Sequence, residues 1–390
     1  MTTSAVEAPV DARRIADTDK LAFVDALRGL AVLLVIWVHH SQAFDALAPI
    51  RFAASYGQMG VQLFFVASAF TLCRSAQLRS GERHATRNFY LRRIFRIAPL
   101  YWCAILGYGL LDAARRATGR AVGDSSYTAA NVLLNFLFVH GLSSAAYNSV
   151  VPGGWSISTE MMFYALFPAL LPAVAFTYRQ LGVSGLAAWT AAAIGVSLVV
   201  QTATAAAGGP EIANNNVVYF SIANQLPVFV IGLGCALLIA DGRLAPQPVR
   251  DAASFALATI AAFALLYGDQ IGLAAWIGPT LGPPVAAVSF VYLLNLARAG
   301  RLPALGGLLA RVGQLSYSMY VCHFLFAWAG TNIVLRTFGA TPGMQALLYL
   351  PTLLLAIAGS MAVASITKRW IEDPGIALGK RLIRRLQRSA

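Results

Sequence analysis

The chain has 390 residues, of which 58% are hydrophobic and only 12% charged, and its formal net charge is +13. A water-soluble domain normally carries about twice that share of charged residues, so the composition excludes an ordinary soluble protein. It also argues against a nucleic-acid-binding protein, because no basic soluble domain of useful size interrupts the apolar sequence. We therefore expect no nucleic-acid partner.

Ten apolar segments are long enough to cross a bilayer as α-helices. They are predicted at residues 21–40, 57–73, 96–112, 157–176, 185–205, 217–240, 252–268, 273–297, 313–335 and 345–367. A further apolar run, residues 131–142, is too short to span comfortably and is expected to be re-entrant or interfacial. The predicted fold class is an all-α, polytopic membrane helical bundle. Its transmembrane domain, residues 21–367, lies between a polar tail, 1–20, and a basic tail, 368–390.

The basic residues indicate how this bundle is oriented. If both termini are cytosolic, only five of the 29 Lys and Arg residues fall on the outer side: Arg51, Arg115, Arg116, Arg120 and Arg336. Cytosolic loops carry the excess of Lys and Arg, so the even number of spans predicts cytosolic N- and C-termini. The net charge of +13 also favours contact with the anionic lipid heads of the bilayer.

The first predicted span carries Arg28 and His39. Their spacing amounts to about three helical turns, so both side chains project from the same face, roughly 16 Å apart. An arginine inside a membrane helix is costly and usually faces a polar interior, and Asp25 could neutralise it by an ion pair. The alternative is that Arg28 reaches the cytosolic interface and His39 lies in water. A neutral imidazole near an interface is the natural general base at pH 7.

A basic segment leads into the third predicted span. Arg93 and Arg96 share one helical face there, with Arg92 beside them and aromatic residues interleaved. Planar guanidinium groups suit phosphates in bidentate geometry, so these arginines are candidate ligands of a phosphorylated substrate. The alternative, which composition alone favours, is ordinary anchoring at the cytosolic interface.

Glu160 lies at the outer start of the fourth predicted span. Residues 152–154 break the chain before it, and Ser156 or Ser158 can cap the helix that follows. A structural alternative is that the helix N-terminus simply favours the negative charge of Glu160. Because Glu160 and His39 are predicted at the same side of the membrane, they can also form a base and the carboxylate that orients it.

Two weaker candidates come from other predicted spans. Ser68 lies in the second span, which must pack against the first, and His323 lies near the middle of the ninth. A buried histidine in a helical bundle is more often a satisfied hydrogen-bonding residue than a catalyst, and we interpret His323 in that way. The four cysteines show neither metal-ligand spacing nor a disulfide pattern, so no metal site is expected.

Taken together, these segments resemble the integral-membrane acyltransferase family 3, whose members O-acetylate bacterial glycans. The matching stretches are residues 23–31 with His39, 60–66, 89–99, 155–160 with 163–164, and 316–320 with His323. The family often has an Asp at the place of Gln62, a Gly at that of Ala69 and a second acidic residue at that of Met161. These departures weaken any role assigned to Gln62 or Ala69. The resemblance covers residues 21–378.

The resemblance implies a reaction and its substrates. It implies acyl transfer from a cytosolic acyl-CoA, most often acetyl-CoA, to a sugar hydroxyl of a cell-surface or exported glycan, or of a lipid-linked saccharide. It further implies a multi-pass protein of the bacterial inner membrane that uses acyl-CoA as donor substrate and holds no bound cofactor. Polysaccharide-assembly proteins are expected partners.

The candidate residues then take definite roles in our hypothesis. The arginines within residues 92–96 hold the phosphates of CoA, and Arg28 contacts the donor deeper in the membrane. His39 accepts the proton of the acceptor hydroxyl, and Glu160 orients His39. Two alternatives remain open. One is a secondary transporter that uses the intramembrane Arg, His and Glu as a substrate or proton site. The other is a non-catalytic subunit of polysaccharide assembly.

Overall fold

Ten candidate membrane spans, all helical, make up most of the molecule. The computed structural model describes residues 10–119, 125–301 and 303–388, and every regular element in these ranges is a helix. The spans are Ala22–Ser41, Ala48–Leu78, Ala85–Ala117, Trp155–Leu181, Val183–Ala206, Val217–Ala240, Pro248–Leu266, Ile277–Arg298, Ser316–Phe338 and Pro342–Arg388. The predicted fold class and the predicted number of spans are therefore confirmed for the described residues.

Both long helices and short helical segments occur along the chain. The helices of ten residues or more are α1 (Val10–Ser41), α3 (Gly60–Leu78), α4 (Ala85–Ala117), α6 (Trp155–Leu181), α7 (Val183–Ala206), α9 (Ile222–Ala240), α10 (Pro248–Leu266), α11 (Ile277–Arg298), α12 (Pro303–Gln314), α15 (Pro342–Thr367) and α16 (Asp373–Arg388). The shorter ones are α2 (Ala48–Ser55), η1 (Tyr56–Met59), α5 (Ala129–Phe136), η2 (His140–Leu142), α8 (Val217–Phe220), α13 (Ser316–Cys322), η3 (Leu325–Gly330), α14 (Thr331–Phe338) and η4 (Lys368–Glu372).

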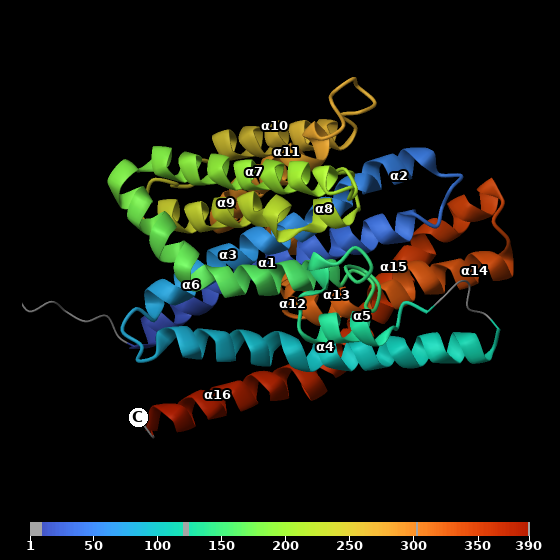
Figure 1. Ribbon diagram of the computed structural model, residues 1–390, viewed down its shortest axis with the longest axis horizontal. Helices are drawn as coiled ribbons and strands as arrows, with labels where there is room; N and C mark the ends of the chain where they lie inside the picture. The colour runs from blue at the N-terminus through green and yellow to red at the C-terminus, as the bar shows by residue number, and fades with distance from the viewer. Residues whose placement is uncertain (1–9, 120–124, 302, 389–390) are drawn as a thin grey trace, which may run out of the picture.

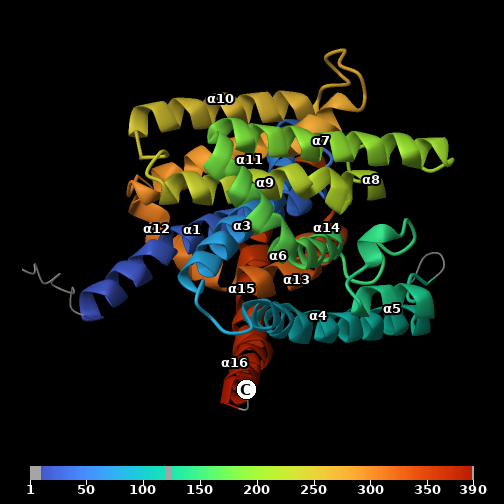
Figure 2. The same ribbon diagram turned by 60° about the vertical axis from the view of Figure 1, so that its left-hand side comes forward.

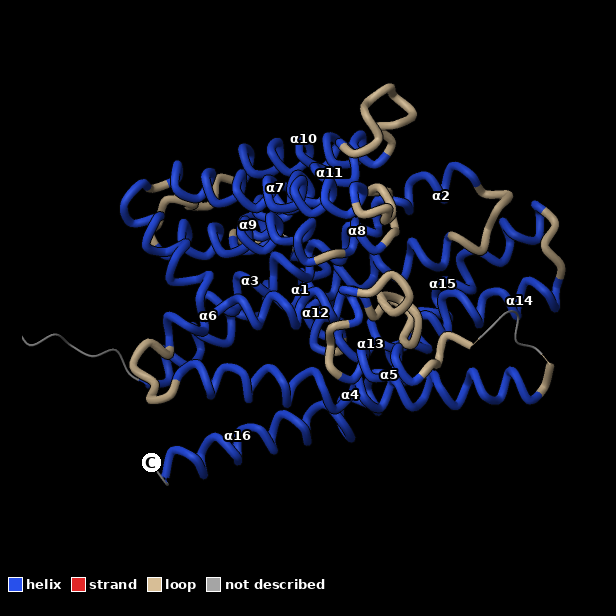
Figure 3. Tube along the Cα trace, in the orientation of Figure 1, coloured by secondary structure: helices blue, strands red, loops and turns tan. Residues whose placement is uncertain are grey.

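The helices α1 and α3 form the centre of the bundle. Helices α7, α9, α10 and α11 lie on one side of this pair, and α4 and α16 lie on the other (Figures 1 and 2). Most connections between long helices are short, but an irregular segment lies beside α5 and α13 (Figure 3). The apolar run 131–142 lies in this part of the chain. It forms α5 and η2 and no span. Its shortness explains why it stays at the edge of the bundle.

The basic tail differs from the simple tail that the sequence predicts. Its described part continues from α15 through η4 into α16, which packs against α4. The approach is close, since a Cβ added at Gly375 would lie 2.8 Å from Pro99 and one at Gly379 would lie 2.7 Å from Phe95. The tail is thus a docked amphipathic helix. In the polar tail, α1 already begins at Val10, and residues 1–9 lie outside the described part.

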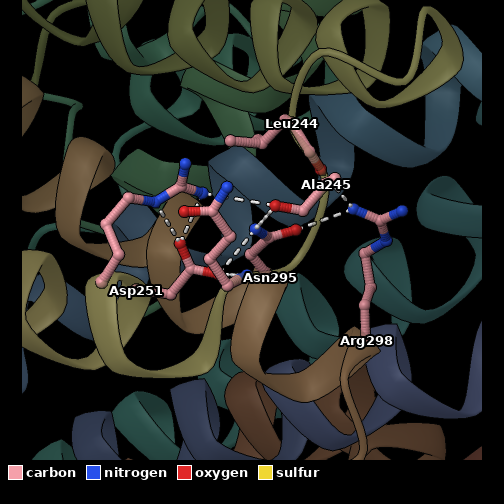
Figure 4. Close-up of polar contacts among 7 residues, drawn as sticks. Leu244, Ala245, Asp251, Asn295 and Arg298 are labelled. Carbon is pink, nitrogen blue, oxygen red and sulfur yellow. Dashed lines mark hydrogen bonds and ion pairs between the residues drawn. The ribbon is translucent and has the colours of Figure 1, made fainter.

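A buried polar cluster ties the loop before α10 to α11 (Figure 4). The fully buried Asp251 carboxylate accepts hydrogen bonds from the Gln247 backbone at 2.8 Å, from Arg250 at 2.8 Å and from Asn295 at 2.8 Å. Arg298 in turn donates to the Asn295 side chain at 2.7 Å and to the Leu244 carbonyl at 3.1 Å. Because a buried charge is tolerated only when it is paired and hydrogen-bonded, this cluster serves to hold the helices together.

Two glycines allow α1 and α12 to cross in backbone contact. A Cβ at Gly313 would lie 1.7 Å from the Asp25 carbonyl oxygen, and a Cβ at Gly29 would lie 2.0 Å from the Leu309 carbonyl oxygen. Small residues permit such close helix packing in membranes. The crossing flanks Arg28, so it fixes the depth and rotation of the α1 segment that carries this side chain.

We expect Gly313→Ala to destabilise the protein by about 1–3 kcal/mol or more, because the new methyl group collides with rigid backbone. Gly306→Ala on the same helix is the matched control, since a Cβ there meets nothing within 4 Å. Thermal unfolding of the two purified variants in the same detergent makes the comparison. Equal unfolding temperatures for the two would contradict the close crossing.

Candidate active site

Arg28 lines a small polar cavity between the central helices, which we call the arginine cavity. Its volume is about 70 Å³. The polar side chains that line it come from α1, α3, α4, α6 and α13: Arg28, Ser68, Arg93, Arg96, Ser156, Glu160, Tyr164, Ser316, Tyr317 and Tyr320. Five of the residues predicted from the sequence therefore meet in one place, namely Arg28, Ser68, Arg93, Arg96 and Glu160. Arg28 itself faces the bundle interior, as expected for an arginine in a membrane helix.

Positive charge exceeds negative charge in the arginine cavity. Three arginines line it, and Glu160 is its one carboxylate within the described residues. That carboxylate accepts hydrogen bonds from Ser68 at 2.7 Å and from Tyr164 on the same oxygen. An excess of guanidinium groups in a region of low dielectric attracts an anion strongly. The arginine cavity is thus suited to a negatively charged group.

The individual arginines are held in different ways. Arg28 donates to Asp25 at 3.4 Å, the ion pair expected from the sequence, and to Thr71 at 3.2 Å. The Arg93 guanidinium lies 5.8 Å from the centre of the Tyr164 ring, and its buried Nε has no hydrogen-bond partner. A buried donor without a partner is rare in folded proteins. Arg93 therefore has hydrogen-bonding capacity left for a ligand.

Arg92, the third arginine of the predicted phosphate group, does not line the cavity. Its guanidinium makes two hydrogen bonds to Glu82, at 2.9 and 2.8 Å. Hydrogen bonds from Arg92 hold the pKa of the Glu82 carboxyl below its usual value. A guanidinium already engaged by both oxygens of a carboxylate is not available to bind phosphate. Arg92 and Arg93 are adjacent in the sequence, but consecutive residues of an α-helix are rotated by about 100°, so the two side chains point in different directions.

His39 lines a second and larger cavity, which we call the histidine cavity. It has a volume of about 330 Å³. The residues that line it come from distant parts of the sequence: Val35, His39, Gln42, Gln58, Val61, Gln62, Asn148, Gly153, Trp155, Asn215, Tyr219, Phe220, Tyr320 and Phe324. A third cavity of about 420 Å³, the rim cavity, shares His39, Gln42, Gln58 and Asn215 with it. His39 therefore stands where two cavities meet.

The arginine and histidine cavities share two lining residues, Val61 and Tyr320. The Tyr320 hydroxyl accepts a hydrogen bond from Ser156 at 2.7 Å and donates one to the Gly153 carbonyl at 3.0 Å. These contacts hold the ring between the two cavities. The face of α1 that carries Arg28 and His39 thus borders a pair of adjoining cavities, with Val61 and Tyr320 as their common wall.

The hydrogen bonds of His39 determine which of its ring nitrogens is basic. Nδ1 lies 2.9 Å from the Val35 carbonyl oxygen, which can only accept, so Nδ1 carries the proton. Nε2 then has a free lone pair, and it makes no hydrogen bond to any described residue. A neutral imidazole in this tautomer, at the wall of two cavities, is arranged to accept a proton.

His323 takes the position beside His39 that the sequence assigned to Glu160. Its Nδ1 donates to the Tyr320 carbonyl at 2.6 Å, which leaves its Nε2 as an acceptor, 3.2 Å from Nδ1 of His39. The two rings lie 5.1 Å apart. Glu160 instead bonds to Ser68 and Tyr164, and no direct bond joins it to His39 within the described part of the chain. The interpretation of His323 as only a satisfied core residue missed this contact.

The turn before α6 also differs from prediction. The helix begins after Gly154 without a side-chain cap. Ser156 bonds to Tyr320, and Ser158 donates to the Phe138 carbonyl at 2.8 Å. The fully buried His140 supports the turn, because its Nε2 donates to the Gly154 carbonyl at 2.9 Å, and burial lowers the pKa of His140. The serines therefore connect α6 to its neighbours and do not cap it.

No cluster of three or more His, Cys, Asp and Glu side chains that could hold a metal ion occurs in residues 10–119, 125–301 and 303–388. What the arrangement offers is a cationic cavity, a free imidazole nitrogen and a polar cavity beside it. Such a set can bind an anionic group and deprotonate a hydroxyl group.

Comparison with known proteins identifies the family. Residues 21–368 match the profile of acyltransferase family 3, which is described as an acyltransferase domain. The chain belongs to this family. The family 3 match contains every residue that lines the arginine and histidine cavities. The protein is therefore an acyltransferase, and its ten candidate spans make it a multi-pass membrane protein.

One curated relative of this family 3 acyltransferase has a name that points to a process. The chain is 30% identical over 271 residues to the exopolysaccharide production protein ExoZ of Rhizobium meliloti (strain 1021), and the match covers 68% of this chain and 75% of ExoZ. No solved structure matches the chain significantly. The resemblance inferred from the sequence is thus confirmed at the level of the family.

Proposed function

We propose that this protein transfers an acyl group, in the first place acetyl, from cytosolic acyl-CoA to a sugar hydroxyl of a cell-surface or exported glycan at the bacterial inner membrane. The observation that carries the proposal is the free Nε2 of His39 in a cavity that adjoins the arginine cavity. The name of the relative, an exopolysaccharide production protein, supports a polysaccharide acceptor.

The proposed chemistry is nucleophilic attack of the sugar hydroxyl on the thioester carbonyl. His39 Nε2 takes the hydroxyl proton as the new C–O bond forms, and the C–S bond breaks as the CoA thiolate leaves. The proton on His39 then passes to the thiolate or to water. His323 accepts a hydrogen bond from Nδ1 of His39 throughout and so keeps the ring oriented. Arg28 faces the donor and stabilises negative charge that develops on its carbonyl oxygen.

The distribution of Lys and Arg supports an assignment of the two cavities to the two sides of the membrane. The N-terminal end of α1, where Arg28 lies, is the end at which the sequence places most Lys and Arg residues, and such segments stay in the cytosol. The arginine cavity then opens toward the compartment that contains acyl-CoA, and the histidine cavity toward the acceptor. At about 70 Å³ the arginine cavity has room for only a few non-hydrogen atoms. This small size favours a short acyl group.

Arg93→Ala and Arg96→Ala are expected to raise the apparent KM for acyl-CoA roughly 10- to 100-fold, because each removes a charged hydrogen-bond donor. The effect on kcat should be smaller. Initial rates with purified enzyme at varied acetyl-CoA measure both constants. Arg92→Ala is the matched control, since Arg92 is held by Glu82 outside the cavity. An unchanged KM in both cavity variants would contradict the assignment of the donor site.

The proposed function is tested by mass spectrometry of surface polysaccharide from cells with and without this chain. We expect a fraction of the sugar residues to differ by one acetyl group, with the modification lost when the chain is removed and restored by complementation. Identical polysaccharides in the two strains would argue against a glycan acceptor.

A further inference from the structure

The polar side chains of the histidine cavity, apart from His39, are uncharged. Five side-chain amides line it: Gln42, Gln58, Gln62, Asn148 and Asn215. No Asp, Glu, Lys or Arg from the described ranges lines this cavity, whereas three arginines line the adjoining one. In the rim cavity, the cation Arg51 is paired with Asp45 at 2.8 Å. The two adjoining cavities therefore suit ligands of different charge.

Gln62 presents a buried carbonyl oxygen that no protein group satisfies. The Tyr219 carbonyl can only accept, so the Gln225 amide donates to it, at 2.8 Å. The Gln225 oxygen then accepts from the Gln62 amide at 3.0 Å, and this direction leaves Gln62 Oε1 as a free acceptor. Gln62 is only 1% exposed. Because buried polar atoms normally have partners, this oxygen calls for a donor from a ligand.

Gln58 repeats the same arrangement on η1. Its Nε2 donates to the Ser55 carbonyl at 3.1 Å, which again fixes the orientation of the amide. Its Oε1 is buried and has no partner. Two amide side chains of fixed orientation thus line the cavity that His39 also lines, and each has a buried carbonyl oxygen without a protein partner. Hydroxyl groups are the donors that satisfy such oxygens without bringing a charge.

Aromatic side chains supply the rest of the wall. Trp155 stacks on Phe220 with ring centres 4.0 Å apart, and both line the cavity together with Tyr219 and Phe324. A pyranose ring has hydroxyl donors at its edge and apolar C–H groups on its face, so it matches amide oxygens and aromatic rings together. A volume of about 330 Å³ is within the range of small-molecule sites.

We propose that the histidine cavity is the acceptor subsite and that it selects an uncharged sugar ring, whose hydroxyls donate to Gln62 and Gln58. This proposal rests on the proposed function and adds the class of sugar that is acylated. A uronic acid is disfavoured, because its carboxylate would meet two acceptor groups and none of the described residues that line the cavity is Lys or Arg.

The test uses the full-length enzyme, acetyl-CoA and three acceptors with the same aglycone: the p-nitrophenyl β-D-glucoside, β-D-galactoside and β-D-glucuronide. We expect acetylation of at least one neutral glycoside and at least tenfold lower kcat/KM for the glucuronide. Gln62→Leu and Gln58→Leu should each raise the KM for the neutral acceptor about tenfold, the effect of one lost hydrogen bond. The KM for acetyl-CoA should stay unchanged. Gln270→Leu, on an exposed loop, is the matched control.

The outcomes separate this inference from the proposed function. Equal use of the glucuronide, or an unchanged acceptor KM in both Leu variants, overturns the neutral-sugar subsite while acyl transfer to sugars stands. Failure of the wild-type enzyme to acetylate any glycoside overturns the proposed function, and the subsite with it. The two variants are independent, because Gln62 lies on α3 and Gln58 on η1, so misfolding of one leaves the other as the test.

Discussion

His39→Ala is expected to lower glycan acylation by 10²- to 10⁴-fold, the usual effect of removing a general base. The structure gives the reason, because the Nδ1 proton of His39 is shared between the Val35 carbonyl and Nε2 of His323, and Nε2 of His39 is left with a free lone pair at the cavity wall. The measurement is the rate of acetyl transfer per mole of purified enzyme. The amount of protein in the membrane should stay normal, since His39 is only partly buried.

The neighbouring His40 supplies the control for this experiment. Its ring is fully buried and bonds to Thr352 at 2.9 Å, and it lines neither cavity. His40→Gln keeps a group that can bond to Thr352, so its activity per molecule should remain close to that of the wild type. Near-normal acylation by His39→Ala would rule out the imidazole as the base. A large loss in His40→Gln would indicate a packing effect at this end of α1.

His323→Leu is expected to lower kcat by about 10²-fold with little change in the KM of either substrate. The variant removes the second acceptor of the Nδ1 proton of His39, 3.2 Å away, and leaves the Val35 carbonyl alone to hold the ring, whose orientation is then less firmly fixed. In a Ser-His-Asp triad, loss of the group that orients the histidine likewise lowers kcat. His323→Gln should recover part of the rate, because an amide oxygen can accept the same hydrogen bond.

The pH dependence of kcat distinguishes a positioning role of His323 from a purely structural one. In His323→Leu the Nδ1 proton of His39 loses one acceptor, so we expect the acidic limb of the kcat profile, where the base becomes protonated, to shift, whereas a purely structural role leaves its shape unchanged. Comparing kcat between pH 5 and 9 for the wild type and both variants makes the test. Equal rates and equal profiles for the Leu and Gln variants would show that His323 only fills space.

The sequence predicted the fold through hydropathy. Ten apolar segments of sufficient length are enough to predict ten spans, because a lipid-exposed segment can satisfy its backbone only as a helix or in a closed barrel. Helical periodicity also predicted that Arg93 and Arg96 share one face. That Arg28 lines the same cavity was not predicted, because Arg28 was expected deeper in the membrane. The Asp25–Arg28 pair follows from the same local rule, and the structure contains it.

The side chains that contact each candidate residue were harder to predict, because these contacts depend on how each helix is rotated about its axis. Depth in the membrane can be read from position along a span, and on that basis Glu160 and His39 were paired. Depth does not say which way α6 turns, and the structure directs Glu160 to Ser68 and Tyr164. The partner of His39 comes from the segment after α13, far away in sequence. Likewise, nothing local in the sequence links Arg92 to Glu82.

The common wall of Val61 and Tyr320 has a consequence for how such an enzyme works across a bilayer. In the proposed reaction, neither CoA nor the sugar has to cross the membrane, because only the few atoms of the acyl group move past one valine and one tyrosine ring. A wall of two side chains is thin enough for group transfer and keeps the two cavities distinct. In the proposed reaction a cell would then modify its exterior with cytosolic thioesters and need no transporter for the donor.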